Sequence, residues 1–162
     1  MDCFLSLGSN MGKRKENIER AIRMLDKSSD ISLLSISRIY ESKAMYNTQM
    51  DNFYNGVVRI KTSLSPDHLL RYTKDIENQL GRKRSKKRYS PRTIDIDILC
   101  YGDKIIHSEE LTIPHPHIKE RKFVLKPWSD IDSDYIIANE NRKIKELLDT
   151  TTDKSTLKKI YA

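Results

Sequence analysis

The stretch at 94–101 reads IDIDILCY, and its alternation of apolar and acidic residues predicts a β-strand. Successive side chains of a strand point to opposite faces, so the core-facing set is expected to be Ile94, Ile96, Ile98 and Cys100. Asp95 and Asp97 then share the other face, about 6.5 Å apart along the strand. The pattern therefore predicts a sheet strand with one apolar face and one acidic face.

The acidic face has two interpretations. It can be the solvated face of an amphipathic strand, or it can bind a cation. Aspartate is disfavoured in strands, and two like charges on one face repel each other. A hard cation offsets both costs, and Mg²⁺ typically binds one or two carboxylates together with substrate phosphates.

A basic segment directly precedes this strand. Residues 82–92, RKRSKKRYSPR, contain seven of the 30 basic residues and no acidic one, which leaves 23 basic and 23 acidic residues elsewhere. The net charge of +7 is therefore local and indicates one polyanion site, for a nucleotide phosphate chain or a stretch of nucleic acid. Guanidinium groups grip phosphate oxygens bidentately, so the preferred ligands are Arg82, Arg84, Arg88 and Arg92. Beside these bases, Asp95 and Asp97 are expected to form a metal–nucleotide site.

The other periodicities predict an α+β fold. Strands are expected at 3–7, 31–40, 53–62 and 94–101, and helices at 18–25 and 66–80, with shorter helices at 120–125 and 143–148. Ser65 is the predicted N-cap of the second long helix and Gly81 its C-terminal glycine, while Pro127 is expected to end the helix at 120–125. The βαββαβ order suggests a ferredoxin-like sandwich, an antiparallel sheet with helices packed on one face.

Length and composition limit the class of protein. The 162 residues suit a single domain, and 37% hydrophobic with 33% charged residues indicates a globular chain. No apolar stretch approaches the roughly 20 residues of a membrane helix, and Cys3 and Cys100 are too few for a disulfide framework or a cysteine zinc site. No aromatic run of the RNA-recognition type is present. We expect a cytoplasmic protein.

Six short motifs follow one another along the chain. They are LGSN at 7–10, FYN at 53–55, E-x-x-x-G-R at 77–82, PRTIDIDIL at 91–99, LTIPHP at 111–116 and R-x-F-V-L-x-P at 121–127. In this order they resemble the family of 6-hydroxymethyl-7,8-dihydropterin pyrophosphokinases, enzymes of folate biosynthesis. The resemblance covers most of the chain, although 128–162 adds little to it.

The resemblance implies an ATP-dependent diphosphokinase that occupies 1–162 as a single domain. Such an enzyme transfers the pyrophosphoryl group of MgATP to the pterin hydroxymethyl group and releases AMP. Two Mg²⁺ ions are expected on Asp95 and Asp97, between the triphosphate and the pterin hydroxyl. The expected partners are the two small-molecule substrates alone, without nucleic acid or membrane, and the chain is expected to be a monomer.

The resemblance also assigns roles to individual residues. The catalytic set is Arg82, Arg92, Asp95 and Asp97, with the two arginines on a loop that closes over ATP. The ATP-binding set adds Leu70, Glu77, Arg84, Arg88, Ile98, Leu111, Thr112, His115 and Arg121. The pterin-binding set is Ser42, Met45, Phe53, Asn55, Asp95 and Phe123, in which the two phenylalanines sandwich the pterin ring.

The sequence departs from the family pattern in two places, and two rival functions remain. The segment Glu41 to Met45 lacks the family's T-x-P and glycine, and Tyr89-Ser90 replaces a Trp-Gly pair. The rivals are a basic ferredoxin-like module that binds RNA or regulates a partner, and an enzyme of the same fold that uses another heterocycle. Phe53, Asn55 and Phe123 can also be plain core residues.

Overall fold

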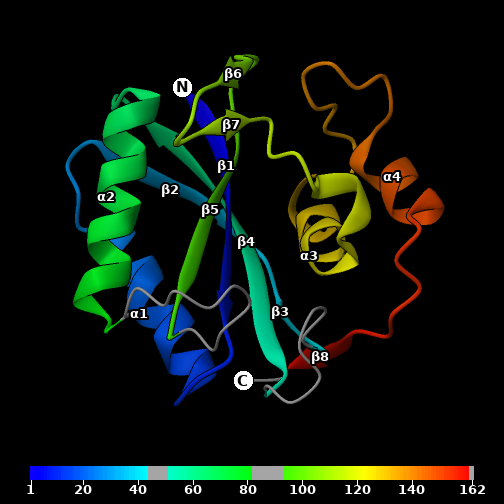
Figure 1. Ribbon diagram of the computed structural model, residues 1–162, viewed down its shortest axis with the longest axis horizontal. Coiled ribbons are helices and arrows are strands. Elements are labelled where there is room, and N and C mark those ends of the chain that lie inside the picture. Colours follow the sequence, from blue (N-terminus) through cyan, green and yellow to red (C-terminus); the bar gives the residue numbers. More distant parts are fainter. Residues whose placement is uncertain (44–50, 82–92, 161–162) are drawn as a thin grey trace.

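The computed structural model describes residues 1–43, 51–81 and 93–160. Its larger sheet has six antiparallel strands in the order β5-β1-β4-β3-β8, with β2 also paired to β4. These strands are β1 (Asp2–Ser9), β2 (Ile31–Ile36), β3 (Ile39–Ser42), β4 (Phe53–Thr62), β5 (Asp95–Tyr101) and β8 (Lys158–Ile160). A separate pair joins β6 (Ile106–His107) to β7 (Thr112–Ile113). The sheet stands between two layers of helices (Figure 1).

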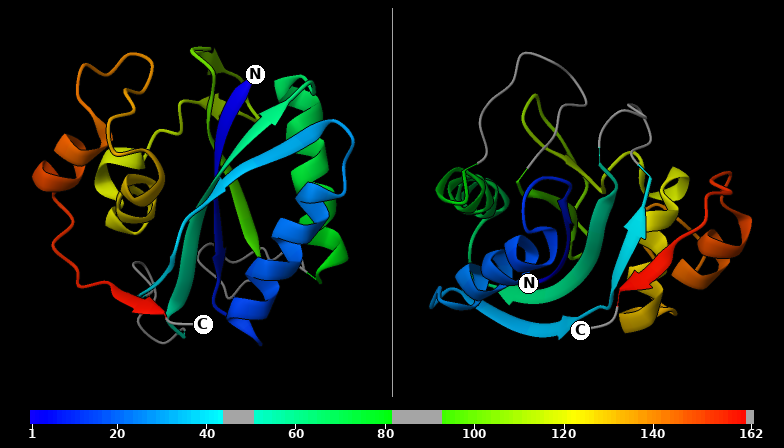
Figure 2. Two further views of the ribbon diagram at one scale, coloured as in Figure 1. Left: turned by 180° about the vertical axis from the view of Figure 1, so that it is seen from behind. Right: turned by 90° about the horizontal axis from the view of Figure 1, so that it is seen from below.

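The first helix layer consists of α1 (Arg14–Asp26) and α2 (Pro66–Gln79), which cover one face of the sheet (Figures 1 and 2). Their apolar stripes pack on β1, β4 and β5 in a core that includes Leu5, Leu25 and Ile76. The expected limits of α2 are confirmed, because Ser65 Oγ accepts a hydrogen bond from the His68 amide and Gly81 adopts a φ of +89°. The Ser65 cap and the left-handed Gly81 therefore end α2 on its two sides in the way its sequence predicts.

A second helix layer covers the opposite face. It contains the turn η1 (Ile118–Glu120), α3 (Lys122–Asp132) and α4 (Ile144–Thr150). Its core holds Phe4, Val57, Leu125, the fully buried Trp128 and Leu147. The prediction that helices pack on one face was therefore wrong. The region from 128 onward has short elements with weak periodicity, which hid this layer.

The boundaries of two predicted elements were also wrong. Pro127 lies inside α3 instead of ending it. The predicted strand at 31–40 is two strands that both pair with β4 and are separated at Ser37, whose Oγ accepts a hydrogen bond from the Val57 amide at 2.8 Å. At this break, the Ser37 hydroxyl accepts a hydrogen bond that a backbone carbonyl would accept in a continuous strand pair.

A bulge in β5 overturns the prediction that Cys100 faces the same core as Ile98. Leu5 pairs with Ile98 but Phe4 pairs with Cys100, so Leu99 is an extra residue on β5. The extra residue reverses the alternation, and Cys100 lies in the second core together with Phe4. Within the described residues, no helix has both the length and the apolar character to span a bilayer.

Candidate active site

The candidate site is centred on Gly8, near the end of β1. Gly8 pairs with Asn55 of β4 on one side and with Asp95 of β5 on the other. Directly paired residues of an antiparallel sheet share a face, so both side chains project from the face that α3 covers further along the sheet. A Cβ on Gly8 would lie 3.2 Å from Asn55 Oδ1 and 3.6 Å from Phe53 Cδ1. The missing side chain therefore makes room for the predicted pterin ligands.

Asp95 and Asp97 lie on the predicted face of β5 and are partly exposed, whereas Ile94, Ile96 and Ile98 are buried on the other face. The shared face expected from the sequence is confirmed. Asp95 lies two strand spacings from Asn55, about 10 Å across the sheet. The acidic pair and the predicted pterin ligands are therefore on one surface.

Glu77, predicted to bind ATP, is buried at the end of α2. Its Oε2 accepts a hydrogen bond of 2.9 Å from the Ile96 amide, on the outer edge of β5. Ile96 lies between the two aspartates, so this bond fixes the strand that carries them. The contact gives Glu77 a structural role.

His115 is held next to β5 in a defined tautomer. Its backbone amide donates to the Leu99 carbonyl at 2.9 Å, and its Nδ1 accepts from the His117 amide at 3.1 Å. Burial, followed by the positive charge of Arg121, lowers the pKa of His115 to about 4. The ring is therefore neutral at pH 7 with its proton on Nε2, which makes His115 a hydrogen-bond donor for an anion rather than a cation.

Arg121 is the N-cap residue of α3, with its guanidinium 5.7 Å from the Phe123 ring centroid. Its Nε is buried and has no hydrogen-bond partner among the described residues. A guanidinium at the positive end of a helix is favoured when an anion lies nearby. Phe123 is half-buried against the second core and keeps part of its ring exposed.

The predicted pterin ligands Ser42, Phe53 and Asn55 lie together where β3 and β4 part. Ser42 pairs with Phe53, and Asn55 is buried with its Nδ2 donating to Ser42 Oγ at 2.8 Å. This bond fixes the amide of Asn55 with Oδ1 over Gly8. Ser42 is thus placed at the site even though the segment that follows it departs from the family pattern.

The predicted adenosine ligands lie on the other side of β5. Ile98 and Leu111 are buried in the first core and Leu70 packs against it, while Thr112 in β7 is partly exposed. Leu70 and Thr112 therefore have exposed surface that a ligand can contact, whereas Ile98 and Leu111 have little exposed surface. Five predicted ligands lie outside the described residues: Met45, Arg82, Arg84, Arg88 and Arg92.

A metal site made by protein alone is not present among residues 1–43, 51–81 and 93–160, where no three His, Cys, Asp or Glu side chains gather for one ion. The two carboxylates of β5 are the oxygen ligands that Mg²⁺ prefers, and Mg²⁺ commonly completes its shell with water and substrate phosphates. The residues present fit a metal that arrives with a nucleotide.

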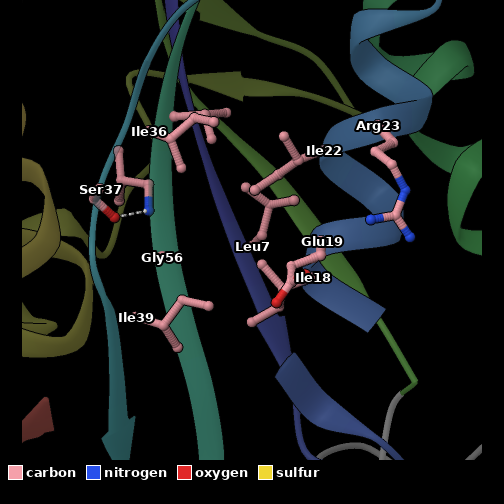
Figure 3. A pocket seen from close by; sticks show the side chains of 11 residues that line it. Leu7, Ile18, Glu19, Ile22, Arg23, Ile36, Ser37, Ile39 and Gly56 are labelled. Atoms are coloured by element: carbon pink, nitrogen blue, oxygen red, sulfur yellow. Dashed lines mark hydrogen bonds between the residues drawn. The ribbon is translucent and has the colours of Figure 1, made fainter. Parts of the chain in front are cut away.

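An apolar cavity of about 260 Å³ lies on the opposite side of the sheet from the candidate site. Figure 3 shows its lining from α1, β1, β4 and the β2–β3 segment, including Ile18, Ile22, Ile39 and Gly56. Among the described residues that line it, Glu19 and Arg23 are the only charged ones. None of the substrate-binding residues predicted from the sequence lines this cavity.

No pattern in the sequence indicated a role for Arg14, which contacts the end of the β3–β4 hairpin next to the site. An arginine at the start of a helix resembles many solvated surface residues. The only local signal is its unfavourable position at the positive end of the α1 dipole.

Comparison with known proteins extends this geometry. The model of the 7,8-dihydro-6-hydroxymethylpterin-pyrophosphokinase family matches residues 4–133. The chain is 41% identical to the Bacillus subtilis 2-amino-4-hydroxy-6-hydroxymethyldihydropteridine pyrophosphokinase, over 79% of this chain and 76% of that protein. It is 37% identical to the Haemophilus influenzae protein of that name, over 96% of each.

Some similar proteins are much longer. The chain is 40% identical to the Schizosaccharomyces pombe folic acid synthesis protein fol1, over 90% of this chain but 20% of that protein. Its fold is similar to that of a Plasmodium falciparum HPPK-DHPS protein crystallised with pteroate, with a TM-score of 0.73 over 91% of this chain and 42% of the other. At 18% identity this likeness shows the ferredoxin-like α+β fold alone, and it confirms the predicted fold class.

Proposed function

Because this chain belongs to the 7,8-dihydro-6-hydroxymethylpterin-pyrophosphokinase family, we propose that it transfers pyrophosphate from ATP to 6-hydroxymethyl-7,8-dihydropterin. The hydroxymethyl oxygen attacks the β-phosphorus of ATP, the bond from the β-phosphorus to the oxygen that bridges it to the α-phosphorus breaks, and AMP leaves with that oxygen. The hydroxyl proton is lost, and the product is the pterin pyrophosphate of folate biosynthesis.

One observation supports this assignment most strongly. Asn55 and Asp95 project from the same face of the sheet on either side of Gly8, and Asn55 Oδ1 and Phe53 lie close above the glycine. This arrangement brings a hydrogen-bonding edge for a heterocycle within about 10 Å of an acidic pair. A bound pterin can therefore direct its side chain toward the carboxylates.

The chain's own residues orient both substrates. Asn55, fixed by Ser42, is suited to read the hydrogen-bonding edge of the pterin, and Phe53 and Phe123 are suited to stack on its ring. His115 donates from Nε2 to a phosphate oxygen, and Arg121 adds positive charge at the N-terminus of α3. Positioning of this kind supplies much of the catalysis in phosphoryl transfer.

Asp95 and Asp97 are proposed to hold two Mg²⁺ ions with the triphosphate. Bound metal neutralises phosphate charge and increases the acidity of a coordinated hydroxyl group. The two carboxylates repel each other on one strand face, and occupancy by a cation relieves that repulsion. Arg82 and Arg92 are proposed to close over ATP, with Arg84 and Arg88 as further phosphate ligands.

The test is AMP release. The chain is incubated with ATP and Mg²⁺, with and without hydroxymethyldihydropterin, and nucleotides are separated by chromatography. We expect AMP only when the pterin is present. Formation of ADP, or of AMP at the same rate without pterin, contradicts the proposal.

The remaining expectations belong to the same proposal. The chain is proposed to act as one domain, as a monomer and in the cytoplasm, on small molecules alone. An RNA-binding module would be stabilised thermally by RNA and not by a MgATP analogue. We expect the reverse, because the positive charge excess is confined to the segment next to the candidate nucleotide site.

A further inference from the structure

Arg14 connects the start of α1 to both strands of the β3–β4 hairpin. Its Nη1 donates to the Asn52 carbonyl at 2.7 Å and lies 3.6 Å from Glu41 Oε2. Its guanidinium carbon lies 4.2 Å from the centroid of the Tyr54 ring. One side chain therefore contacts the residue before β4, the second residue of β4 and the facing residue of β3.

These contacts lie on the opposite face of the sheet from the predicted pterin ligands. Glu41 pairs with Tyr54, and the next pair, Ser42 with Phe53, is where the two strands part. Side chains alternate along β4, so Tyr54 points to the α1 side while Phe53 and Asn55 point to the candidate site. Arg14 thus touches the backbone and side chains that set the position of the ligands, without touching the ligands themselves.

Local helix energetics do not explain an arginine at this position. Arg14 is the first residue of α1, where the helix dipole disfavours a positive charge, and the N-cap residue Lys13 makes no side-chain capping bond. Contacts to Glu41 and the Asn52 carbonyl offset this cost. The side chains of Arg14 and Glu41 are 26% and 22% exposed, whereas those of the Lys15–Glu19 pair on α1 are 38% and 47% exposed. Screening by water is weaker at the Arg14 pair.

We infer that Arg14 is a positioning residue for the pterin, acting through Glu41, Asn52 and Tyr54; this rests on the proposed function. Loss of the guanidinium frees the end of the hairpin, so Ser42 and Asn55 no longer hold the pterin edge in one place. His115 and Arg121 do not depend on this contact. The pterin KM should rise while ATP binding stays unchanged.

The test compares Arg14→Ala, Arg14→Lys, Glu41→Gln and the Arg14→Ala/Glu41→Gln double variant, with Lys15→Ala as the matched control on the same helix. For Arg14→Ala we expect the pterin KM to rise about tenfold, the scale of one lost charge-assisted hydrogen bond, with kcat and MgATP-analogue binding changed less than about threefold. Arg14→Lys should recover part of the loss, and Lys15→Ala should behave as the wild type. The free-energy loss in pterin binding, taken from the rise in pterin KM, should be smaller in the double variant than the sum of the losses in the two single variants.

Amide hydrogen exchange at 53–55 gives a readout that does not depend on activity. We expect faster exchange there in Arg14→Ala than in Lys15→Ala. Unchanged pterin KM and exchange in Arg14→Ala overturn the inference, as does an equal loss of ATP and pterin binding. If the wild type forms no AMP, the proposed function fails, and the exchange measurement alone then decides whether Arg14 holds the hairpin.

Discussion

The sheet carries a glycine on each face, Gly8 on β1 and Gly56 on β4, and the surroundings of the two differ in chemistry. On the α3 side, the absence of a side chain on Gly8 lets Asn55 Oδ1 and Phe53 approach the strand closely, next to Asp95. On the α1 side, Gly56 lines an apolar cavity together with residues such as Ile18. The two glycines lie on adjacent strands one register position apart, with Gly8 opposite Asn55 and Gly56 opposite Leu7, and the predicted ligands lie on the Gly8 side.

This difference shows that space alone does not define a site. The α1-side cavity offers apolar surface with no convergent polar groups beyond Glu19, Arg23 and Ser37, and Ser37 Oγ is already bonded to the Val57 amide. The α3 side holds carboxylates, an amide fixed by a hydroxyl group and a neutral histidine. We expect substitutions on the α3 side to change activity and those in the α1-side cavity to change stability.

The largest effect is expected for Asp97→Asn. Removing one charge from the acidic face should lower turnover by about 10³-fold or more, the scale of losing a key electrostatic group in an active site. The folded chain should be as stable as the wild type, because the change relieves repulsion between like charges. Steady-state AMP formation and urea unfolding measure the two quantities. Turnover within threefold of the wild type would exclude Asp97 as a metal ligand.

Ile18→Ala tests the opposite face. Ile18 on α1 is 1% exposed and its side chain faces the sheet, so its truncation enlarges the existing cavity. The free energy of unfolding should fall by about 2–5 kcal/mol. Turnover per folded molecule should stay near that of the wild type at a temperature where both remain folded. A loss of turnover without a loss of stability would show that the α1 side takes part in the reaction.

Phe123→Ala separates stacking from core packing. The ring is half-buried next to the site, so its loss should weaken pterin binding by about 1–3 kcal/mol. Binding of a MgATP analogue should change much less. Calorimetric titrations with each ligand make the comparison, and an equal loss for both would mark Phe123 as a core residue.

His115 is expected to make the free energy of unfolding depend on pH. Its pKa falls from 6.5 to about 4 on folding, so between these values the unfolded chain binds a proton that the folded chain does not. The free energy of unfolding should therefore decrease as the pH falls from 6.5 toward 4. His115→Gln should make this decrease shallower. Urea unfolding at pH 7 and pH 5 in EDTA measures both slopes, and identical slopes would contradict the lowered pKa of His115 in the folded chain.

The smallest effect is expected at the rim of the cavity. Ile36 is 53% exposed on β2, so Ile36→Thr removes little buried surface and keeps a β-branched residue in the strand. Stability should change by no more than about 0.5 kcal/mol, and turnover should not change. Thermal unfolding provides the comparison with Ile18→Ala. A larger loss would indicate that another segment covers Ile36.

Local patterns predicted those parts of the molecule whose cause is local. The cap at Ser65, the left-handed Gly81 and the alternation from Ile94 to Ile98 depend on residues a few positions apart, and each is confirmed. The acidic pair was found because two like charges on a strand face are unfavourable without a partner. The family resemblance placed Asn55 and His115 in the site, and the structure brings both to the α3 side.

Features that depend on distant segments were not accessible in this way. The face of Cys100 depends on the bulge opposite Phe4 and Leu5, which no pattern in 94–101 reveals. Pro127 remains inside α3 because packing of the second core outweighs the lost hydrogen bond. The contact of Arg14 with Glu41 joins residues 27 positions apart, and only the fold brings them together.

Pyrophosphoryl transfer is proposed to take place on the α3 side of the sheet and not in the α1-side cavity. Its most direct test follows the label from ATP carrying ³²P at the β-position, in single turnover, with the wild type, Asp97→Asn and Ile18→Ala. We expect labelled pterin at equal rates in the wild type and Ile18→Ala, none in Asp97→Asn, and no labelled ADP. Label that remains in ADP, or an equal loss of transfer in both variants with the fold intact, would contradict it.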